Sequence, residues 1–245
     1  MEREQLDAWL DPRRLREHLR HILGANRFDV SQAAVAEMRQ KFPDLDLVDS
    51  SLPAVSDLER MARAAEAAGL AVKGVSKSGG ASASAGIGGM VLVTSHGFSG
   101  SYLGSRHGVS MQAIAGEGTS METDYDYTSA LHASDLEAPE TIGRRAGERA
   151  VARLNPRKVS TRKVPVVYDP RVSSTLVGHL VGAINGASIA RKTSFLKDSM
   201  GKQILSAGLN VIDDPLKPRG LRSRPFDGEG IAARRWVLIE DGVLK

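Results

Sequence analysis

The sequence contains no cysteine and few aromatic residues, which make up 4% of its 245 residues. The lack of cysteine excludes disulfide bonds and thiolate metal ligands within the chain, and it leaves the redox compartment undetermined. No run reaches the roughly 18 consecutive apolar residues that a membrane-spanning helix needs. The charged N-terminus MEREQLDAWLDPRRLREHLR does not fit a secretory signal. We therefore expect a cytoplasmic protein that does not enter the membrane.

The excess of positive charge is small, with 33 Lys and Arg against 29 Asp and Glu. Acidic residues are interspersed among the basic ones, and no basic run alternates with the aromatic side chains on which single-stranded nucleic acids stack. Nucleic acid is therefore not the expected partner. A hydrophobic content of 41% is enough for a core. We predict an α+β fold, a mainly antiparallel sheet with packed helices, preceded by an N-terminal helical arm.

The arm corresponds to residues 1–42, which are charged and carry leucines at helical spacing. His18 and His21 lie on one face of it and are able to share a metal ion, but no further ligand stands at a suitable spacing. The alternative is that both histidines are solvated surface residues. The next segment, Phe42–Pro53, is bounded by prolines and predicts a linker or domain edge.

The run SDLERMARAAEAAGLA predicts a helix, with Ser56 and Glu59 as a capping box and Gly69 as the C-cap. From Val72 to Val109 the sequence becomes rich in glycine, serine and β-branched residues. It lacks the GxGxxG and GxxxxGK[ST] patterns of phosphate-binding loops. The run therefore predicts strands joined by hairpin turns, which start an antiparallel sheet over about residues 72–128.

Two histidines of this glycine-rich stretch are candidate ligands. His96 stands in the predicted turn Ser95–Gly97, and His107 follows it in the same stretch. We expect both to be turn or sheet-surface residues rather than metal ligands, because neither is part of a pattern with ligand spacing.

The densest group of carboxylates follows this sheet: Glu117, Glu122, Asp124 and Asp126. Paired carboxylates serve as general acid and base or bind hard metal ions. Spacing alone fixes no shared geometry, so the alternative is a solvated acidic loop.

In the second half of the chain, Pro139–Leu154 predicts an amphipathic helix and Pro165–Tyr168 a short buried strand. Near the C-terminus, Arg234–Val243 predicts a strand that enters a turn at Asp241-Gly242. The run DDPLKPRGLRSRPFDGEG, which precedes this strand, is rich in proline, glycine, aspartate and arginine. Its arginines at positions 219, 222 and 224 are able to clamp an anion, but acidic neighbours make a hydrogen-bonded structural loop an equal alternative.

The remaining stretch, Ser173–Phe195, predicts one long helix with a buried apolar stripe of Leu176, Leu180 and Ile184. Its first serines are suited to accept hydrogen bonds from free backbone N–H groups, and Arg191 and Lys192 follow at the end, where positive charge is favourable. His179 is the one side chain of this helix that is suited to chemistry.

Four runs together carry a family resemblance: IAGEGTSMETDYDYTSA, LNPRKVSTRKVPVVYDPRV, GHLVGAINGASIARKTSFLKDSMGKQIL and DDPLKPRGLRSRPFDGEGIAARR. In this order and spacing, the chain from about Pro43 onward resembles the PmbA/TldE branch of the TldD/PmbA family, known as modulators of DNA gyrase and as proteases that mature antibiotic peptides. The resemblance implies that residues 43–245 are the central part of such a protein. Residues 1–42 would be an atypical arm, and the family's C-terminal part would be absent.

The resemblance also implies a degenerate zinc motif. In the TldD branch the equivalent helix carries HExxxH, and zinc peptidases need about three protein ligands, an open water position and a carboxylate. Aligning Gly178-His179 with the start of the motif places Leu180 at the glutamate and Ile184 at the second histidine. We therefore expect no catalytic residue, no metal ligand and no cofactor in this chain, with His179 as a hydrogen-bonded interior or interface residue.

By the same resemblance, the chain is expected to be the zinc-less subunit of a TldD/TldE heterodimer that cuts unfolded or extended peptides, with zinc in the TldD-like partner. Candidate contacts to peptide or partner are charged residues: Arg191, Lys192, Arg224, Asp227 and Glu229. Two alternatives stay open. One is a non-enzymatic protein that binds DNA gyrase or another target. The other is a stand-alone hydrolase built on the carboxylates of Glu117–Asp126 or on Asp227 and Glu229.

Overall fold

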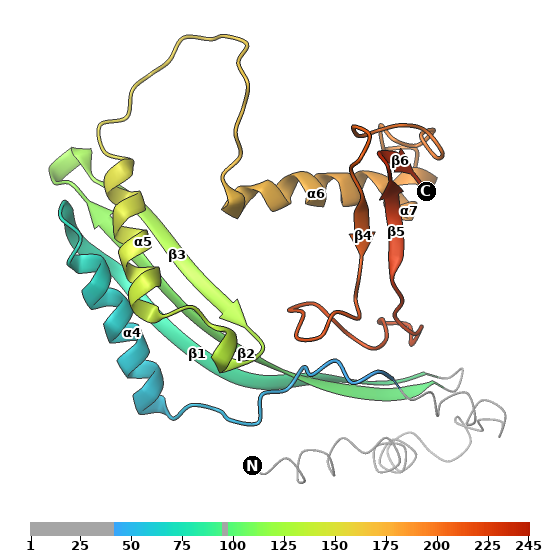
Figure 1. The fold of residues 1–245 in the computed structure, drawn as a ribbon, viewed down its shortest axis with the longest axis horizontal. Helices are drawn as coiled ribbons and strands as arrows, with labels where there is room; N and C mark the ends of the chain where they lie inside the picture. Colours follow the sequence, from blue (N-terminus) through green and yellow to red (C-terminus); the bar gives the residue numbers. More distant parts are fainter. Residues whose placement is uncertain (1–41, 95–97) are drawn as a thin grey trace. The chain divides into compact units, whose positions relative to one another are not determined.

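The computed structural model describes residues 42–94 and 98–245, which form two compact units (Figure 1). The described part of the first unit lies within residues 42–156 and 215–234, and the second unit consists of residues 157–214 and 235–245. The predicted helical arm, apart from its last residue Phe42, lies outside the described residues, as do His18, His21 and His96. Each unit is considered by itself below.

The first unit is built on an antiparallel sheet with the strand order β1-β2-β3. β1 (Val75–Val93) and β2 (Ser99–Ala115) form a long hairpin that curves along its length (Figure 1). β3 (Glu122–Ala130) follows the short helix η2 (Gly118–Ser120) and pairs with β2 from His107 to Ala115. The antiparallel sheet is therefore confirmed, and with its helices the α+β class.

Two helices, α4 (Val55–Leu70) and α5 (Pro139–Ala152), pack against this sheet (Figure 1). The start of α5 at Pro139 is confirmed, because proline at the first helical position loses no hydrogen bond. The core between helices and sheet is made mostly of small side chains: Ala65, Val109, Met111, Ala113, Ala115, Ala146 and Ala150. Small side chains let the helices lie close to the strands and to each other.

The contact between α4 and α5 is close enough to require glycine. A Cβ atom on Gly143 of α5 would lie 1.8 Å from the carbonyl oxygen of Ala65. Gly69 of α4 is also buried here, and a Cβ on it would lie 3.0 Å from the carbonyl oxygen of Gly143. The prediction that Gly69 caps the helix was therefore wrong, since it lies inside α4 and serves packing, while Ala71 is the C-cap.

The predicted capping box at the start of α4 was also wrong. The helix begins one residue before Ser56, with Ala54 at the N-cap and no side chain capping the backbone. Ser56 is then a helical residue, and Glu59 pairs instead with Arg63 one turn later, at 2.7 Å. The ion pair of Glu59 with Arg63 along the helix surface thus takes the place of the capping box expected at the helix N-terminus.

The glycine-rich run does not form turns. Gly79, Gly80, Gly86, Gly88 and Gly89 all lie within β1, which continues without a break to Val93. Small residues alternate between the two faces of this strand, and pairing with β2 is regular except for irregularities near its start. The prediction that these glycines form hairpin turns was therefore wrong. The predicted strands on either side of Ser95–Gly97 are confirmed as β1 and β2, and the predicted turn itself lies outside the described residues.

The segment Phe42–Pro53 is not a linker. Leu45 and Leu47 are buried against Leu131, and the Leu47 carbonyl accepts the Ser105 backbone N–H at 2.9 Å. The segment thus lies beside β2 at Ser105, near the His107 end of the pairing with β3. It is packed because Leu45 and Leu47 are both buried in a cluster with Leu131.

Residues 215–234 return to this unit and are anchored by one aromatic side chain. Phe226 is fully buried, and its ring centroid lies 5.2 Å from that of Phe42, 4.9 Å from Phe98 and 5.3 Å from Tyr102. Edge-to-face contacts of this kind add to the burial of apolar surface. The loop is therefore part of the core of the first unit, although it is distant in sequence.

The second unit contains α6 (Pro170–Ile184), α7 (Gly186–Ala190) and a small antiparallel sheet of β4 (Val211–Asp213), β5 (Trp236–Glu240) and β6 (Val243–Leu244). The predicted strand and its turn at Asp241-Gly242 are confirmed, and both turn residues have positive φ, 49° and 77°. No helix among the described residues is long and apolar enough to cross a membrane.

Two predictions in this unit were wrong. Pro165–Tyr168 is not a buried strand: Val167 is 94% exposed, and the segment pairs with no strand in the described part of the chain. The predicted helix Ser173–Phe195 is interrupted at Asn185 and divided into α6 and α7. A run of apolar residues forms a buried strand only if another surface covers it, and the sequence does not report that.

Candidate functional site

Helix α6, which carries the predicted motif positions His179, Leu180 and Ile184, is capped by a side chain at its start. The Asp169 carboxylate accepts the Arg171 backbone N–H at 2.9 Å, and Pro170 is the first helical residue. The serines predicted as caps are not used in this way, since the Ser173 hydroxyl donates to the Pro170 carbonyl at 3.0 Å. At the other end, the Asn185 side chain accepts the Ala187 N–H at 3.0 Å and starts α7.

The apolar stripe of α6 is not buried. Leu176, Val177 and Val181 are each more than two-fifths exposed, and Ala183 is the buried residue of the helix. His179 is exposed, so its prediction as an interior residue was wrong, and its role at an interface stays a prediction. Leu180 and Ile184 are half-buried. The helix is held near Ala183, whose carbonyl accepts the buried Ser194 hydroxyl at 2.6 Å.

The residues around His179 do not fit a catalytic zinc ion. His179 supplies one imidazole, but Leu180 and Ile184 have no lone pair to offer a metal or a proton. Across residues 42–94 and 98–245, no three His, Asp or Glu side chains gather in a way that would hold a metal ion.

The five predicted contact residues are divided between the two units. Arg191 is the C-cap of α7 and Lys192 follows it with a φ of 59°, both exposed in the second unit. The other three, Arg224, Asp227 and Glu229, share one loop of the first unit. The predicted set is therefore not one site within a single unit.

Asp227 has a structural role in that loop. Its carboxylate accepts the backbone N–H groups of Ile231 and Glu229, each at 2.9 Å. These hydrogen bonds, the one from Ile231 foremost, lower the pKa of Asp227. A carboxylate kept ionised by backbone donors is a poor general acid, so the stand-alone hydrolase based on Asp227 has no support in this geometry.

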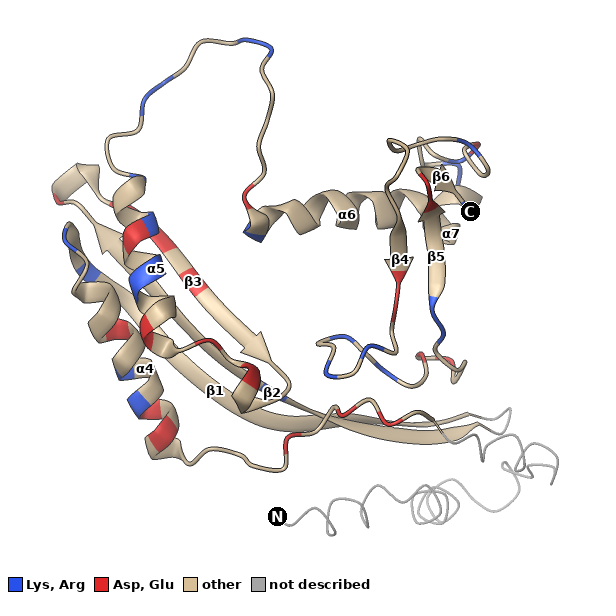
Figure 2. Cartoon of the chain, viewed as in Figure 1, with Lys and Arg blue, Asp and Glu red and all other residues tan. Residues whose placement is uncertain are grey.

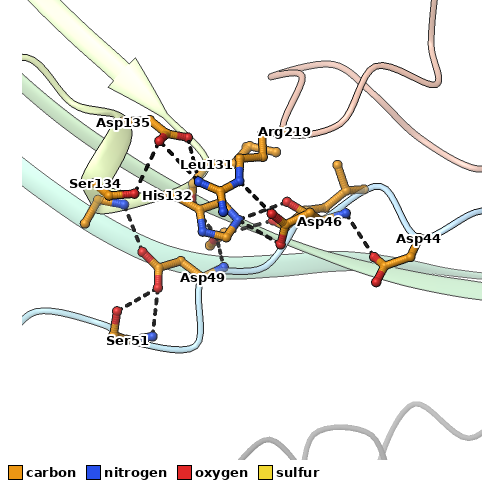
Figure 3. A network of polar contacts seen from close by, with 12 residues as sticks. Asp44, Asp46, Asp49, Ser51, Leu131, His132, Ser134, Asp135 and Arg219 are labelled. Carbon is orange, nitrogen blue, oxygen red and sulfur yellow. Dashed lines mark hydrogen bonds and ion pairs between the residues drawn. The ribbon is translucent and has the colours of Figure 1, made fainter.

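A polar network joins the loop 215–234 to the segment 42–51 (Figure 3). We call its members the polar clamp: Asp46, Asp49, His132, Asp135 and Arg219. The Arg219 guanidinium lies 2.6 Å from Asp46 Oδ2 and 3.2 Å from Asp135, and the hydrogen bonds to Asp46 and then Asp135 raise the pKa of Arg219. Of the two alternatives for Arg219, the structure supports the structural loop.

The second half of the polar clamp holds the segment against the short helix η3 (Ala133–Asp135) (Figure 3). Asp49 accepts the Ala133 backbone N–H at 2.8 Å and the Ser51 hydroxyl at 2.7 Å, and these bonds hold the pKa of Asp49 well below its usual range. His132 Nε2 lies 2.9 Å from the Asp46 carbonyl oxygen. The clamp fixes the backbone entering α4.

His107, predicted on a turn or the sheet surface, is buried in β2 with its Nε2 3.5 Å from Asp49. Every second residue of a strand faces the same side of the sheet. His107 shares its side of β2 with Ser105, Val109 and Met111, which are also buried, so this pattern could have predicted its burial. The prediction was wrong because the whole strand was not recognised as one element.

The carboxylates predicted as acid, base or metal ligands are divided by the fold. Asp124 and Asp126 are buried on β3 and pair with arginines of α5 and of its C-cap, and the alternating charges of this helix are visible in Figure 2. Asp126 lies 2.6 Å from Arg145 and 2.5 Å from Arg149, and Asp124 lies 3.2 Å from Arg153. Glu117 is exposed in the loop before η2, and Glu122 begins β3. The solvated-loop alternative was wrong for the two aspartates, whose role is structural.

Two family models match this chain. The PmbA/TldA metallopeptidase central domain matches residues 49–154, and the PmbA/TldA metallopeptidase C-terminal domain matches residues 161–245. The boundary between the matches falls where the chain passes from the first compact unit to the second.

Curated proteins give the same result. The chain is 43% identical over 203 residues to Metalloprotease PmbA of Escherichia coli O157:H7, covering 82% of this chain and 45% of that protein. It is 37% identical over 204 residues to the Metalloprotease PmbA homolog of Haemophilus influenzae, covering 83% of this chain and 45% of that protein. The chain thus spans about half the length of the curated relatives it matches.

Among solved structures, a Bacteroides thetaiotaomicron protein called a modulator of DNA gyrase aligns with a TM-score of 0.78 and 32% identity over 84% of this chain and 48% of its own. TldE from Thermococcus kodakarensis aligns with a TM-score of 0.61 over 85% of this chain and 49% of its own, and at 20% identity it supports the fold alone. The sequence and fold together establish that this chain belongs to the PmbA/TldD metallopeptidase family.

Proposed function

We propose that this chain acts as a zinc-less, PmbA/TldE-type subunit of a heterodimeric metallopeptidase, in which a TldD-type partner supplies the zinc and the catalytic glutamate. The observation that carries the proposal is the composition of α6 at the motif. His179 is followed by Leu180 and, five positions along, by Ile184, and neither is able to bind metal or accept a proton. The expected location is the cytoplasm, and the expected substrates are unfolded or extended peptides.

The exposed face of α6 supports the need for a partner. Leu176, Val177 and Val181 lie on the same helix as the motif positions and remain largely exposed. Apolar side chains gathered on one helix face favour burial against another protein surface. The exposed cations Arg191 and Lys192 follow the helix and are candidate contacts to peptide or partner.

The proposal is tested by metal content and by peptide cleavage. The chain would be purified alone and with a TldD-type protein, its zinc measured by mass spectrometry, and its cleavage of an unfolded peptide followed by chromatography. We expect less than about one-tenth of a zinc ion per chain and no cleavage alone, because one imidazole does not supply the about three ligands that such a site needs. Stoichiometric zinc together with peptidase activity in the isolated chain would refute the proposal.

A matched pair of substitutions assigns the active subunit. His179→Ala in this chain should leave cleavage by the mixed complex within about twofold, because its imidazole is not a ligand in this proposal. The equivalent histidine of the TldD-type partner, replaced by alanine, should abolish cleavage and zinc binding. Loss of activity on His179→Ala with the complex still assembled would place chemistry in this chain.

The alternative function is non-enzymatic binding to DNA gyrase or another target. It is favoured by one observation, the description of the Bacteroides thetaiotaomicron structural relative as a modulator of DNA gyrase. Affinity purification separates the two functions. Recovery of gyrase without a TldD-type protein, together with no cleavage after a TldD-type protein is added, would favour the binding function.

A further inference from the structure

The connection between α5 and α6 contains a segment without helix or strand, residues 156–168, which we call the tether (Figure 1). Each of its residues is exposed. Within the ranges 42–94 and 98–245 we find no hydrogen bond or ion pair that joins the tether to another residue. Exposed backbone without hydrogen bonds is the preferred place for proteolytic cleavage of a folded chain.

The tether carries positive charge alone. Two basic pairs, Arg157-Lys158 and Arg162-Lys163, are each followed by a valine, and residues 156–168 include no Asp or Glu. Figure 2 shows these cations on the connection between α5 and α6. Endopeptidases of the trypsin class bind a basic side chain in a pocket that ends in a carboxylate. The tether offers such an enzyme both an accessible backbone and cations that no acidic neighbour neutralises.

An exposed basic side chain is not sufficient for cleavage. Arg222 in the loop 215–234 is exposed as well, but the backbone beside it is held, because the Arg224 N–H donates to the Pro215 carbonyl at 3.0 Å. A protease reaches such a peptide bond only after local opening of the loop. The backbone of the tether needs no opening of this kind, so it should be cut first.

The path of the chain decides what a cut in the tether separates. The chain passes between the two compact units after residues 156, 214 and 234. A cut in the tether severs the first of these connections, and the other two lie in the C-terminal fragment. That fragment therefore keeps residues 215–234, which belong to the first unit, although no peptide bond joins it to the N-terminal fragment any longer.

The contacts of residues 215–234 with the N-terminal fragment do not depend on the tether. Phe226 is fully buried, and its ring contacts those of Phe42, Phe98 and Tyr102. Arg219 pairs with two carboxylates of the polar clamp, both of which lie in the N-terminal fragment. A buried aromatic side chain in a pocket of other rings is the usual anchor of a stable interface.

We propose that the tether is a cleavage site for endopeptidases that cut after basic residues, and that the cleaved chain persists as a non-covalent complex of its two fragments. The bond that breaks joins Lys158 to Val159 or Lys163 to Val164. One water is consumed: its oxygen enters the new lysine carboxylate, and both of its protons go to the new valine ammonium group. The proposal does not rest on the function proposed above.

The site is tested by brief digestion of the folded full chain with trypsin, with the products identified by mass spectrometry. Among residues 42–94 and 98–245, cuts in the tether should be at least about tenfold faster than the cut after Arg222, because they need no local opening. Replacing the four tether cations by glutamine should remove these cuts, whereas the matched control Arg222→Gln should leave them unchanged. First cleavage at Arg222, or elsewhere in the described ranges with the tether intact, overturns the proposal.

The complex is tested on the cleaved, unmodified chain by size-exclusion chromatography and by sedimentation velocity after dilution. We expect both fragments to elute together, and their separation at micromolar concentration overturns the proposal without any variant.

A matched pair of substitutions locates the contact between the fragments. Phe226→Ala should raise the Kd of the fragments at least about tenfold, because it removes the buried anchor. Leu221→Ala changes an exposed residue of the same loop and should alter the Kd less than about threefold. Circular dichroism of the uncut variants checks their fold. A Kd that a folded Phe226→Ala variant leaves unchanged overturns the role of residues 215–234.

Discussion

Arg219 and Asp46 lie 173 residues apart in the sequence, and the Arg219 Nε lies 2.6 Å from Asp46 Oδ2. The Arg219 backbone N–H also donates to the Leu45 carbonyl at 2.9 Å. One residue thus ties the loop 215–234 to the segment that leads into α4. The first compact unit is therefore completed by a part of the chain that follows most of the second unit.

Replacing Arg219→Ala should destabilise the first unit measurably but weakly, since both partners are two-fifths or more exposed and exposed pairs contribute little. The loss should shrink at high salt, because ions screen exposed charges. Urea unfolding at low and high salt measures both effects. The control Arg222→Ala, for which no ion pair is found in the described part of the chain, should change stability by less than about 0.5 kcal/mol. Equal losses in both variants would remove the polar clamp as the cause.

Replacing Asp49→Asn should cost about 2 kcal/mol at pH 7, because a buried carboxylate that accepts several hydrogen bonds becomes neutral. The pKa of Asp49 is lowered in the folded state by the Ala133 N–H and by Ser51. Its contribution is therefore complete above the unfolded-state pKa of about 3.9 and declines as the pH falls below it. The difference between the variant and the unmodified protein should shrink below about pH 4.

Thermal unfolding between pH 2.5 and pH 7 measures this dependence. Asp213→Asn, an exposed position in β4, serves as the control and should leave the pH profile unchanged. A stability difference for Asp49→Asn that stays constant over this range would contradict the assignment of the lowered pKa to the native contacts.

Replacing Asp126→Asn should destabilise the protein by about 3 kcal/mol, because Arg145 and Arg149 would lose a buried counter-charge. Glu148→Gln is the matched control. It breaks the pair with Arg144, in which both side chains are more than half exposed, and should cost less than about 0.5 kcal/mol. Chemical denaturation measures the free energy of unfolding of both variants. A similar loss of stability in the two would contradict the argument that the buried ion pair contributes more than the exposed one.

Replacing Gly143→Ala should destabilise the contact of α4 and α5 by about 3 kcal/mol or more, since the new methyl group would collide with the Ala65 carbonyl. Gly178→Ala makes the same chemical change in α6, where the methyl group meets nothing within 4 Å. It should stabilise that helix by about 0.5 to 1 kcal/mol through helix propensity. Calorimetry is suited to resolve the two effects, and a neutral Gly143→Ala would contradict the close approach.

Local features of the sequence predicted local structure well. Pro139 marked the start of α5, because the proline ring fixes φ at a value that suits the first turn of a helix. Asp241-Gly242 marked the turn between β5 and β6, because glycine adopts the positive φ that this turn requires. Capping was predicted less well. Ser56 and Glu59 fit a capping box, yet the helix begins one residue earlier and Glu59 pairs along the helix with Arg63. Several local interactions of similar strength compete at a helix end.

The site was predicted in part. The runs that resemble the PmbA/TldE branch led to the right family. The assignment of His179, Leu180 and Ile184 to a degenerate zinc motif stays a prediction. The burial of these residues did not follow, because a helical stripe of leucines does not reveal what covers it. The acidic group was also misjudged, since Asp124 and Asp126 are neutralised by arginines that come some twenty to thirty residues later.

The sequence by itself determined the family and the α+β class, because these depend on which residues follow one another. The tertiary structure decided which charges are paired and that His107 is buried. Arg219 meets Asp46 only after the chain has folded back over 173 residues. Such contacts depend on the packing of the first unit as a whole, and no short run of residues encodes them.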